Sequence, residues 1–379
     1  MNKLALRRMW FQVHKWIGLL LAILIIPISV TGAALVWHDG LDKLVNPARY
    51  ATSGETLLPL ARYVAAARQK GGAEDRVANV VLPEEGGPVT VTLAPAPPKG
   101  RPAGGPPART MVYLDPPTAA VLDVASNRSG LVRTLHVLHG SLMVPGVGRQ
   151  IVGWIGVFMM LSCFTGLWLW WPTVGRWARG LRWRRHSNTD TNLHYLTGFW
   201  VAIPLFVLSL TGAWISFPAF FGSLVGEGQR GRGPDRGAMM RARPLERPAL
   251  DIDRVVALGR PLGPDAALRT VVLPTDRTPD WTLSYDTQPM VTVTVADDSG
   301  TVARGARGGP GGGNPIARLM RRLHDGTGMG IVWQTIIFLG GIIPALLAVT
   351  GIIMWWRARN WRKALATKQR ARRNLAPAE

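Results

Sequence analysis

Four of the seven histidines in this 379-residue chain recur at matched distances from threonine–glycine pairs. His14 and His194 precede Thr31-Gly32 and Thr211-Gly212 by one common interval, and His139 and His324 precede Thr165-Gly166 and Thr350-Gly351 by another. Agreement at four positions indicates an internal repeat, so the chain is interpreted as two copies of one unit.

The repeat assigns the histidines to two pairs, His14 with His194 and His139 with His324. One interpretation is simple hydrogen bonding of imidazoles at helix ends. The other is metal binding, because an imidazole in or beside a membrane is costly without a partner and iron accepts imidazole ligands. This second interpretation predicts two hemes b, each held noncovalently between two imidazoles, since the chain has no Cys-x-x-Cys-His. Zinc or copper is less favoured, because no carboxylate or thiolate is matched between the two copies.

Three further histidines have less specific positions. His136 lies one helical turn before His139 and could replace or support it as a ligand. His38 follows the first apolar stretch and is another candidate. His186 lies among arginines and is expected to be solvated. Four glycines near the histidines could let a flat macrocycle or a neighbouring helix approach closely: Gly18, Gly32, Gly198 and Gly212.

The elements that must position these residues are four apolar stretches without Asp, Glu, Lys or Arg. They are Ile17–Trp37, Ile151–Pro172, Leu196–Phe221 and Ile331–Trp356. Because roughly 20 helical residues cross the hydrocarbon layer, each stretch is predicted to span a membrane. Paired tryptophans such as Trp170-Trp171 are expected to anchor the ends in the lipid interface, and packing of some of them on a cofactor is the alternative. The single cysteine, Cys163, is expected to be a packing residue.

Lysine and arginine in the short connections predict the orientation, because such residues stay in the cytoplasm. They cluster before the first stretch, between the second and third, and after the fourth. Both termini are therefore predicted to lie in the cytoplasm, and the protein in a bacterial inner membrane. The net charge of +21 is not accompanied by a folded basic module, so nucleic-acid binding is not expected.

The predicted fold is an α-helical membrane protein, with four transmembrane helices as a parallel tandem repeat and two periplasmic α+β modules. The predicted segments are 1–37 (cytoplasmic N-terminus and first helix), 38–149 (module 1), 150–172 (second helix), 173–193 (cytoplasmic loop), 194–221 (third helix), 222–330 (module 2), 331–356 (fourth helix) and 357–379 (cytoplasmic tail).

Each module is predicted to contain a helix followed by strands. The expected helices are 57–69 and 251–258, and the expected strands are 77–82, 89–93, 110–114, 268–273, 281–285 and 290–295. Tracts rich in Pro, Gly and Arg at 95–107, 222–244 and 304–315 are typical of linkers, and a basic flap facing a ligand is the alternative.

Several motifs carry a resemblance to a known family. They are His14-Lys-Trp-Ile-Gly18, Tyr113-Leu-Asp-Pro-Pro-Thr118, Gly148-Arg149 and the helix end Thr165-Gly-Leu-Trp-Leu-Trp-Trp171. The chain resembles the PepSY-associated transmembrane family, also called iron-regulated membrane proteins, over nearly its whole length. Module 2 departs from the pattern, because it has Asp297-Asp-Ser-Gly300 in place of an Asp-Pro-x-Thr-Gly turn.

Among family members, the chain resembles the FoxB-type ferric-siderophore reductases. That resemblance implies an enzyme that passes electrons through membrane heme to a ferric siderophore in the periplasm. No Gly-x-Gly-x-x-Gly follows a predicted strand, so a quinone or a cytoplasmic reductase is the expected electron donor. The alternatives are a non-enzymatic PepSY-type binding or regulatory protein and a siderophore permease, the latter disfavoured because the spans lack charged residues.

Overall fold

The computed structural model describes residues 3–83, 86–95, 108–172, 177–183, 185–225, 242–287, 290–305 and 315–374. Four of its helices are long and apolar enough to cross a membrane: α1 (Lys3–Leu35), α5 (Gly148–Trp170), α6 (Thr189–Ser216) and α11 (Gly330–Asn374). The prediction of four membrane-spanning helices is thus confirmed. The predicted linker tracts lie mostly outside the described residues.

Two helices extend well past the apolar stretches. α1 begins at Lys3, so the basic residues before the span belong to the same helix, and α11 continues beyond Trp356 to Asn374. α6 instead ends at Ser216, before the predicted boundary at 221, and Phe217 leads into α7 (Pro218–Leu224). A proline ring cannot continue the hydrogen bonding of a helix, which explains the break at Pro218.

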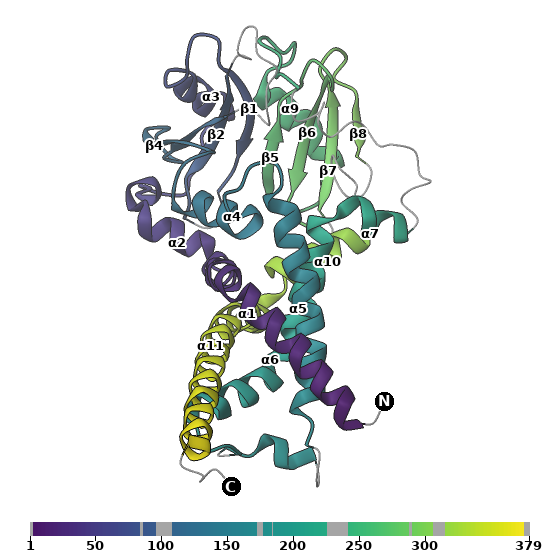
Figure 1. Cartoon of the computed structure of the whole chain (residues 1–379). Coiled ribbons are helices and arrows are strands. Elements are labelled where there is room, and N and C mark those ends of the chain that lie inside the picture. Colours follow the sequence, from purple (N-terminus) through teal and green to yellow (C-terminus); the bar gives the residue numbers. More distant parts are fainter. Residues whose placement is uncertain are drawn as a thin grey trace. The chain divides into compact units, whose positions relative to one another are not determined.

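The chain divides into two compact units. The helical unit comprises residues 1–37, 135–225 and 315–379, and the sheet unit comprises 38–134 and 226–314. In the helical unit the short helices are α4 (Leu131–Ser141, which begins in the sheet unit), η2 (Trp177–Leu181), α7 and α10 (Pro315–Asp325). Figure 1 shows α1, α5, α6 and α11 packed as long helices, with the N-terminus and the end of α11 toward the same end of this unit.

Small residues let the long helices pack closely. A side chain at Gly156 would meet the Ser209 carbonyl oxygen at 3.0 Å, so α5 and α6 approach through this glycine. A side chain at Gly341 would meet the Ser29 carbonyl oxygen at 2.8 Å, where α11 approaches α1. Cys163 is buried between these helices in a cluster with Val201, and its predicted packing role is confirmed.

The tryptophans at the helix ends have two different environments. Trp171 and Trp356 are exposed on the described structure, as expected of residues that face lipid or its interface. Trp170 is only 4% exposed and stacks on Phe199 with ring centroids 4.0 Å apart. The expectation of an interfacial anchor was therefore wrong for Trp170, which packs α5 against α6.

The sheet unit contains one antiparallel sheet in the order β4-β3-β2-β1-β5-β6-β7-β8. Its strands are β1 (Arg76–Val81), β2 (Val89–Ala94), β3 (Thr110–Leu114), β4 (Val121–Ser126), β5 (Leu268–Val272), β6 (Asp280–Tyr285), β7 (Val291–Ala296) and β8 (Val302–Arg304). Its helices are α2 (His38–Val45), η1 (Pro47–Tyr50), α3 (Leu60–Arg68), α9 (Ile252–Gly259) and η4 (Arg260–Leu262). The six predicted strands agree with this structure to within one residue at each end, and β4 and β8 were not predicted.

The two modules expected from the sequence share this single sheet. β1 pairs antiparallel with β5, with Val80 opposite Val271, and both residues are fully buried in one common core. The Asp253 carboxylate on α9 also accepts hydrogen bonds from the backbone amides of Leu60 and Ala61, at the start of α3. A carboxylate at this position stabilises the free amides at the start of a helix. Asp253 therefore links the two modules in addition to the pairing of β1 with β5.

One buried aspartate holds each module together. Asp115 accepts hydrogen bonds from the Ser53 amide (2.7 Å) and the Thr118 hydroxyl (2.5 Å). Asp297 accepts from the Ala249 amide (2.8 Å) and from Trp281 Nε1 (2.8 Å). Both carboxylates connect a strand turn to the segment that leads into the module's helix. The different turn sequences of the modules therefore perform the same structural function.

Candidate functional site

The structure brings the four matched histidines together as two pairs. The first pair is His14 of α1 and His194 of α6, whose ring centroids are 6.4 Å apart. The second pair is His139 of α4 and His324 of α10, whose ring centroids are 5.9 Å apart. Each pair thus takes one histidine from each half of the chain.

The pairs lie at opposite ends of the helical unit. His14 lies just before the apolar stretch of α1, whereas His139 contacts the carbonyl oxygen of Ile28 within that stretch. The stretch of α1 from His14 to Ile28 corresponds to about 21 Å along the axis, at roughly 1.5 Å per residue. That length covers much of the ~30 Å hydrocarbon layer.

Threonine hydroxyls orient the first pair. His14 Nδ1 lies 3.0 Å from Thr165 Oγ1 on α5, and His194 Nδ1 lies 2.9 Å from Thr350 Oγ1 on α11. Each hydroxyl also lies within hydrogen-bond distance of a carbonyl oxygen one turn earlier in its own helix, to which it can donate. With the hydroxyl proton on that carbonyl, each imidazole donates from Nδ1 and its Nε2 keeps a free lone pair.

Backbone carbonyls orient the second pair. His139 Nδ1 donates to the Ile28 carbonyl oxygen at 2.9 Å. His324 Nδ1 lies 3.2 Å from the Leu208 carbonyl oxygen and 3.0 Å from Thr211 Oγ1. Burial lowers the pKa of His139, and burial together with the neighbouring His139 lowers the pKa of His324 to about 4. Both rings are neutral at pH 7, the form in which imidazole binds a metal.

The glycines of the four Thr-Gly pairs make room for these rings. A Cβ added at each of these glycines would lie close to Cε1 of one histidine. The distances are 2.7 Å from Gly32 to His139, 3.1 Å from Gly166 to His14, 3.1 Å from Gly212 to His324 and 3.6 Å from Gly351 to His194. Of the four glycines singled out from the sequence, Gly32 and Gly212 therefore accommodate imidazoles. Gly18 has nothing within 4 Å, and Gly198 is in ordinary contact with Leu347.

We expect Thr165→Val to lower the free energy of unfolding by about 0.5–1.5 kcal/mol, because it removes the nearer acceptor of the His14 Nδ1–H and leaves only Ser162 Oγ at 3.4 Å. Denaturant titration of detergent-solubilised protein, followed by circular dichroism, would measure this effect. Thr165→Ser keeps the acceptor and should be close to wild type. Thr335→Val is the matched control, since among the described residues that exposed hydroxyl is hydrogen-bonded to the Ile331 carbonyl oxygen of its own helix alone. Equal losses for Thr165→Val and Thr335→Val would contradict the orienting role.

The centroid spacing of both pairs is close to that of two imidazoles on either side of one metal ion. A metal sits about 2 Å from the bound nitrogen of each ring, which places the two ring centroids roughly 6 Å apart. Within the described residues, no group of three or more His, Cys, Asp or Glu side chains could hold a metal ion. A metal ion between the two rings of either pair would therefore need further ligands from outside the described residues.

The other candidate histidines lie apart from these ring contacts. His136 is exposed on α4, and it is His139 of that helix whose ring faces His324. His38 begins α2 in the sheet unit, where its Nε2 lies 3.3 Å from the Asp39 carboxylate.

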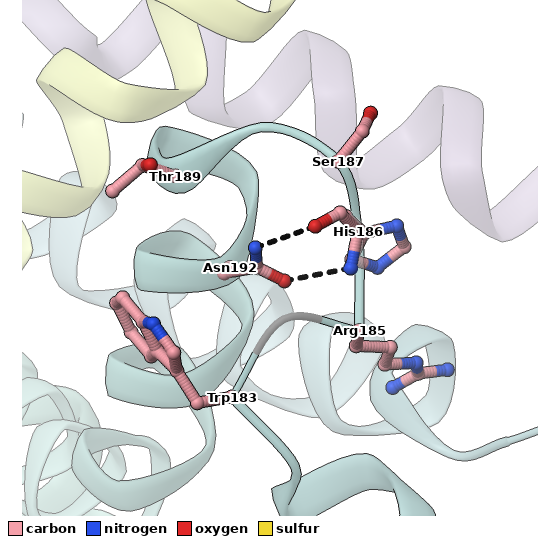
Figure 2. A pocket seen from close by; sticks show the side chains of 6 residues that line it. All are labelled: Trp183, Arg185, His186, Ser187, Thr189 and Asn192. Carbon is pink, nitrogen blue, oxygen red and sulfur yellow. Dashed lines mark hydrogen bonds between the residues drawn. The ribbon is translucent and has the colours of Figure 1, made fainter.

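His186 is not simply solvated, contrary to the expectation from the sequence. Its ring packs on Tyr195 with centroids 4.7 Å apart, and its Nε2 is buried with no hydrogen-bond partner among the described residues. Asn192 fixes the backbone of His186 through two hydrogen bonds of 2.7 Å. Figure 2 shows the pocket that His186 and Asn192 line together with Trp183, Arg185, Ser187 and Thr189. Burial and the adjacent Arg185 lower the pKa of His186.

The family model described as the PepSY-associated TM region matches residues 11–358. The chain belongs to this family. No match was found among curated proteins. The matched residues include all four histidines of the two pairs. They also include both segments of the sheet unit.

Proposed function

We propose that this PepSY-associated membrane protein is a heme-b oxidoreductase that carries electrons across the bacterial inner membrane and reduces ferric siderophores in the periplasm. The observation that carries the proposal is the presence of two histidine pairs at opposite ends of one helical unit. In both pairs the Nδ1 atoms are already engaged, and the ring spacing suits a metal between them.

Heme would be held by His14 with His194 and by His139 with His324. When bound, it supplies a one-electron carrier whose potential depends on its axial ligands and on their hydrogen bonds. The chain contributes the orientation of each imidazole through Thr165, Thr350 and the Ile28 and Leu208 carbonyls. Such hydrogen bonds fix the tautomer and the ring direction, and they make the free nitrogen a better ligand.

Charge at the helix ends supports the proposed direction of transfer. Arg7 donates to the Leu169 and Trp171 carbonyl oxygens, Arg185 donates to the Trp170 carbonyl oxygen, and Arg357 pairs with Asp190. These arginines gather at the end of the helical unit that carries the first pair. Arginine-rich ends stay in the cytoplasm, so the first pair would receive electrons and the second pair would deliver them.

The substrate follows from the chemistry of iron and from the family resemblance. Hard oxygen ligands such as hydroxamates hold Fe(III) much better than Fe(II), so a one-electron reduction weakens the chelate and releases the iron. Electrons would come from a quinone or a cytoplasmic reductase.

Purified protein expressed with sufficient heme tests the proposal. We expect a red protein with b-type absorption bands that sharpen on dithionite reduction, and reoxidation of these bands by a ferric trihydroxamate with capture of Fe(II) by ferrozine. A folded, colourless protein would sink the heme proposal. A red protein that the chelate cannot reoxidise would retain heme binding and exclude this substrate class.

A further inference from the structure

The part of α11 beyond its apolar span is strongly basic. Residues 357–370, here called the basic segment, contain six basic side chains and no acidic one: Arg357, Arg359, Arg362, Lys363, Lys368 and Arg370. Two of them have structural partners, since Arg357 pairs with Asp190 and Arg359 lies over the Trp355 ring. The side chains of residues 361–370 are all exposed.

The length of the basic segment exceeds what lipid headgroups can contact. It continues α11 without a break and extends about 21 Å, at roughly 1.5 Å per residue. The headgroup layer on one side of a bilayer is only about 5–8 Å thick. Even a helix tilted by roughly 40° would therefore carry Lys368 and Arg370 into water, and the membrane's own potential decays within about 8 Å there.

Two large apolar side chains lie among these charges. Trp361 is 66% exposed and Leu365 is 41% exposed, and their spacing of one helical turn places them on one face of the helix. Lys368 follows on the same face, one turn later. A tryptophan anchor surrounded by basic residues is the composition of a protein-binding surface, in which the aromatic residue supplies affinity and the charges supply association rate and specificity.

The basic segment is directly connected to the first histidine pair. It begins about 10 Å along α11 from Thr350, at roughly 1.5 Å per residue, and Thr350 orients His194. The Arg357–Asp190 pair holds its base against the start of α6, next to Thr189 of the pocket in Figure 2. A protein bound to the segment would therefore lie close to the end of the unit where electrons are proposed to enter.

We infer that the basic segment is the docking surface for a soluble electron-donor protein with an acidic face. Of the two donor classes open to the proposed function, the segment favours a cytoplasmic protein over a quinone. This inference rests on the proposed function for the identity of the partner, and on charge, length and exposure for the surface itself.

The test uses the full chain in nanodiscs of neutral lipid, with flavodoxin, a small acidic flavoprotein, as the probe. We expect binding that weakens more than about tenfold when the salt rises from roughly 20 to 200 mM. The variant Lys363→Glu/Lys368→Glu/Arg370→Glu should weaken binding at least about tenfold, and Trp361→Ala should weaken it without changing the salt dependence. The matched control is Arg62→Glu/Lys70→Glu/Arg277→Glu, which changes the charge of exposed sheet-unit residues equally and should bind like wild type.

Equal weakening by both triple variants would overturn the inference, since binding would then report overall charge. Absence of flavodoxin binding to the wild type in the neutral-lipid discs would also overturn it and would leave lipid headgroups as the occupant of the segment. Binding does not require heme, so a colourless protein that binds the probe would refute the proposed function and keep the docking surface. A red protein that does not bind flavodoxin would refute the docking surface and keep the proposed heme function.

Discussion

Replacing His194 by alanine is expected to lower the heme content from about two to about one per chain. Each proposed heme has one imidazole on either side, and His194 is half of the first pair, with its ring 6.4 Å from that of His14. The pyridine hemochrome assay on purified protein would measure the content. His324→Ala should produce the same loss at the second pair, and the double variant should lose both hemes.

The control variants for this experiment are His186→Ala and His38→Ala. Both histidines lie apart from the two ring contacts, so these variants should keep the full heme content. Retention of two hemes by both His194→Ala and His324→Ala would contradict the assignment. Loss of both hemes in each single variant, with normal folding by circular dichroism, would indicate one shared site instead of two separate sites.

Adding one methyl group at Gly32 is expected to disrupt the second site, whereas the same change at Gly351 is expected to be tolerated. A Cβ at Gly32 would lie 2.7 Å from Cε1 and 3.0 Å from Nδ1 of His139, closer than packed atoms allow, so the ring must move away from Ile28. A Cβ at Gly351 would lie 3.6 Å from Cε1 of His194, an ordinary contact. Displacement of a ligand's supporting hydrogen bond typically costs about 10–100-fold in metal affinity.

Heme retention during dialysis against apomyoglobin would measure this contrast. Gly32→Ala should lose one heme at least about tenfold faster than wild type, and Gly351→Ala should match wild type. Both variants add the same single methyl group at the glycine of a Thr-Gly pair within a long helix, so general helix propensity cannot explain a difference between them. Equal retention in both variants would show that the close approach at Gly32 has no role in holding the second site.

The sequence alone predicted the four spanning helices and the grouping of the histidines, because both depend on simple periodicities. A long uncharged apolar stretch has few alternatives to a membrane span, and matched offsets identify partners without any knowledge of distance. The hydrogen-bond partners of the histidines could not be predicted in the same way. Thr165 belongs to the same sequence motif as His139, yet it binds His14, because helix packing decides which faces meet.

The environments of Trp170 and His186 and the edge strands of the sheet could not be predicted from local sequence patterns. Trp170 and Trp171 have the same sequence context, but only Trp170 faces Phe199. His186 was expected to be solvated because its neighbours are arginines, whereas Tyr195 on the following helix covers its ring. The edge strands β4 and β8 were missed, since β4 alternates only weakly between buried and exposed residues and β8 is very short.

The first four strands and the last four strands of the sheet meet only where β1 pairs with β5. If the chain were cut between α5 and α6, each half would keep four strands. The strand β1 or β5 would become an unpaired edge, and Val80 or Val271 would lose the neighbouring strand that now helps to bury it. Such edges pair readily with other chains. Each half would also keep only one histidine of each pair. Neither half therefore carries a complete sheet or a complete histidine pair, and one polypeptide supplies both halves in equal number.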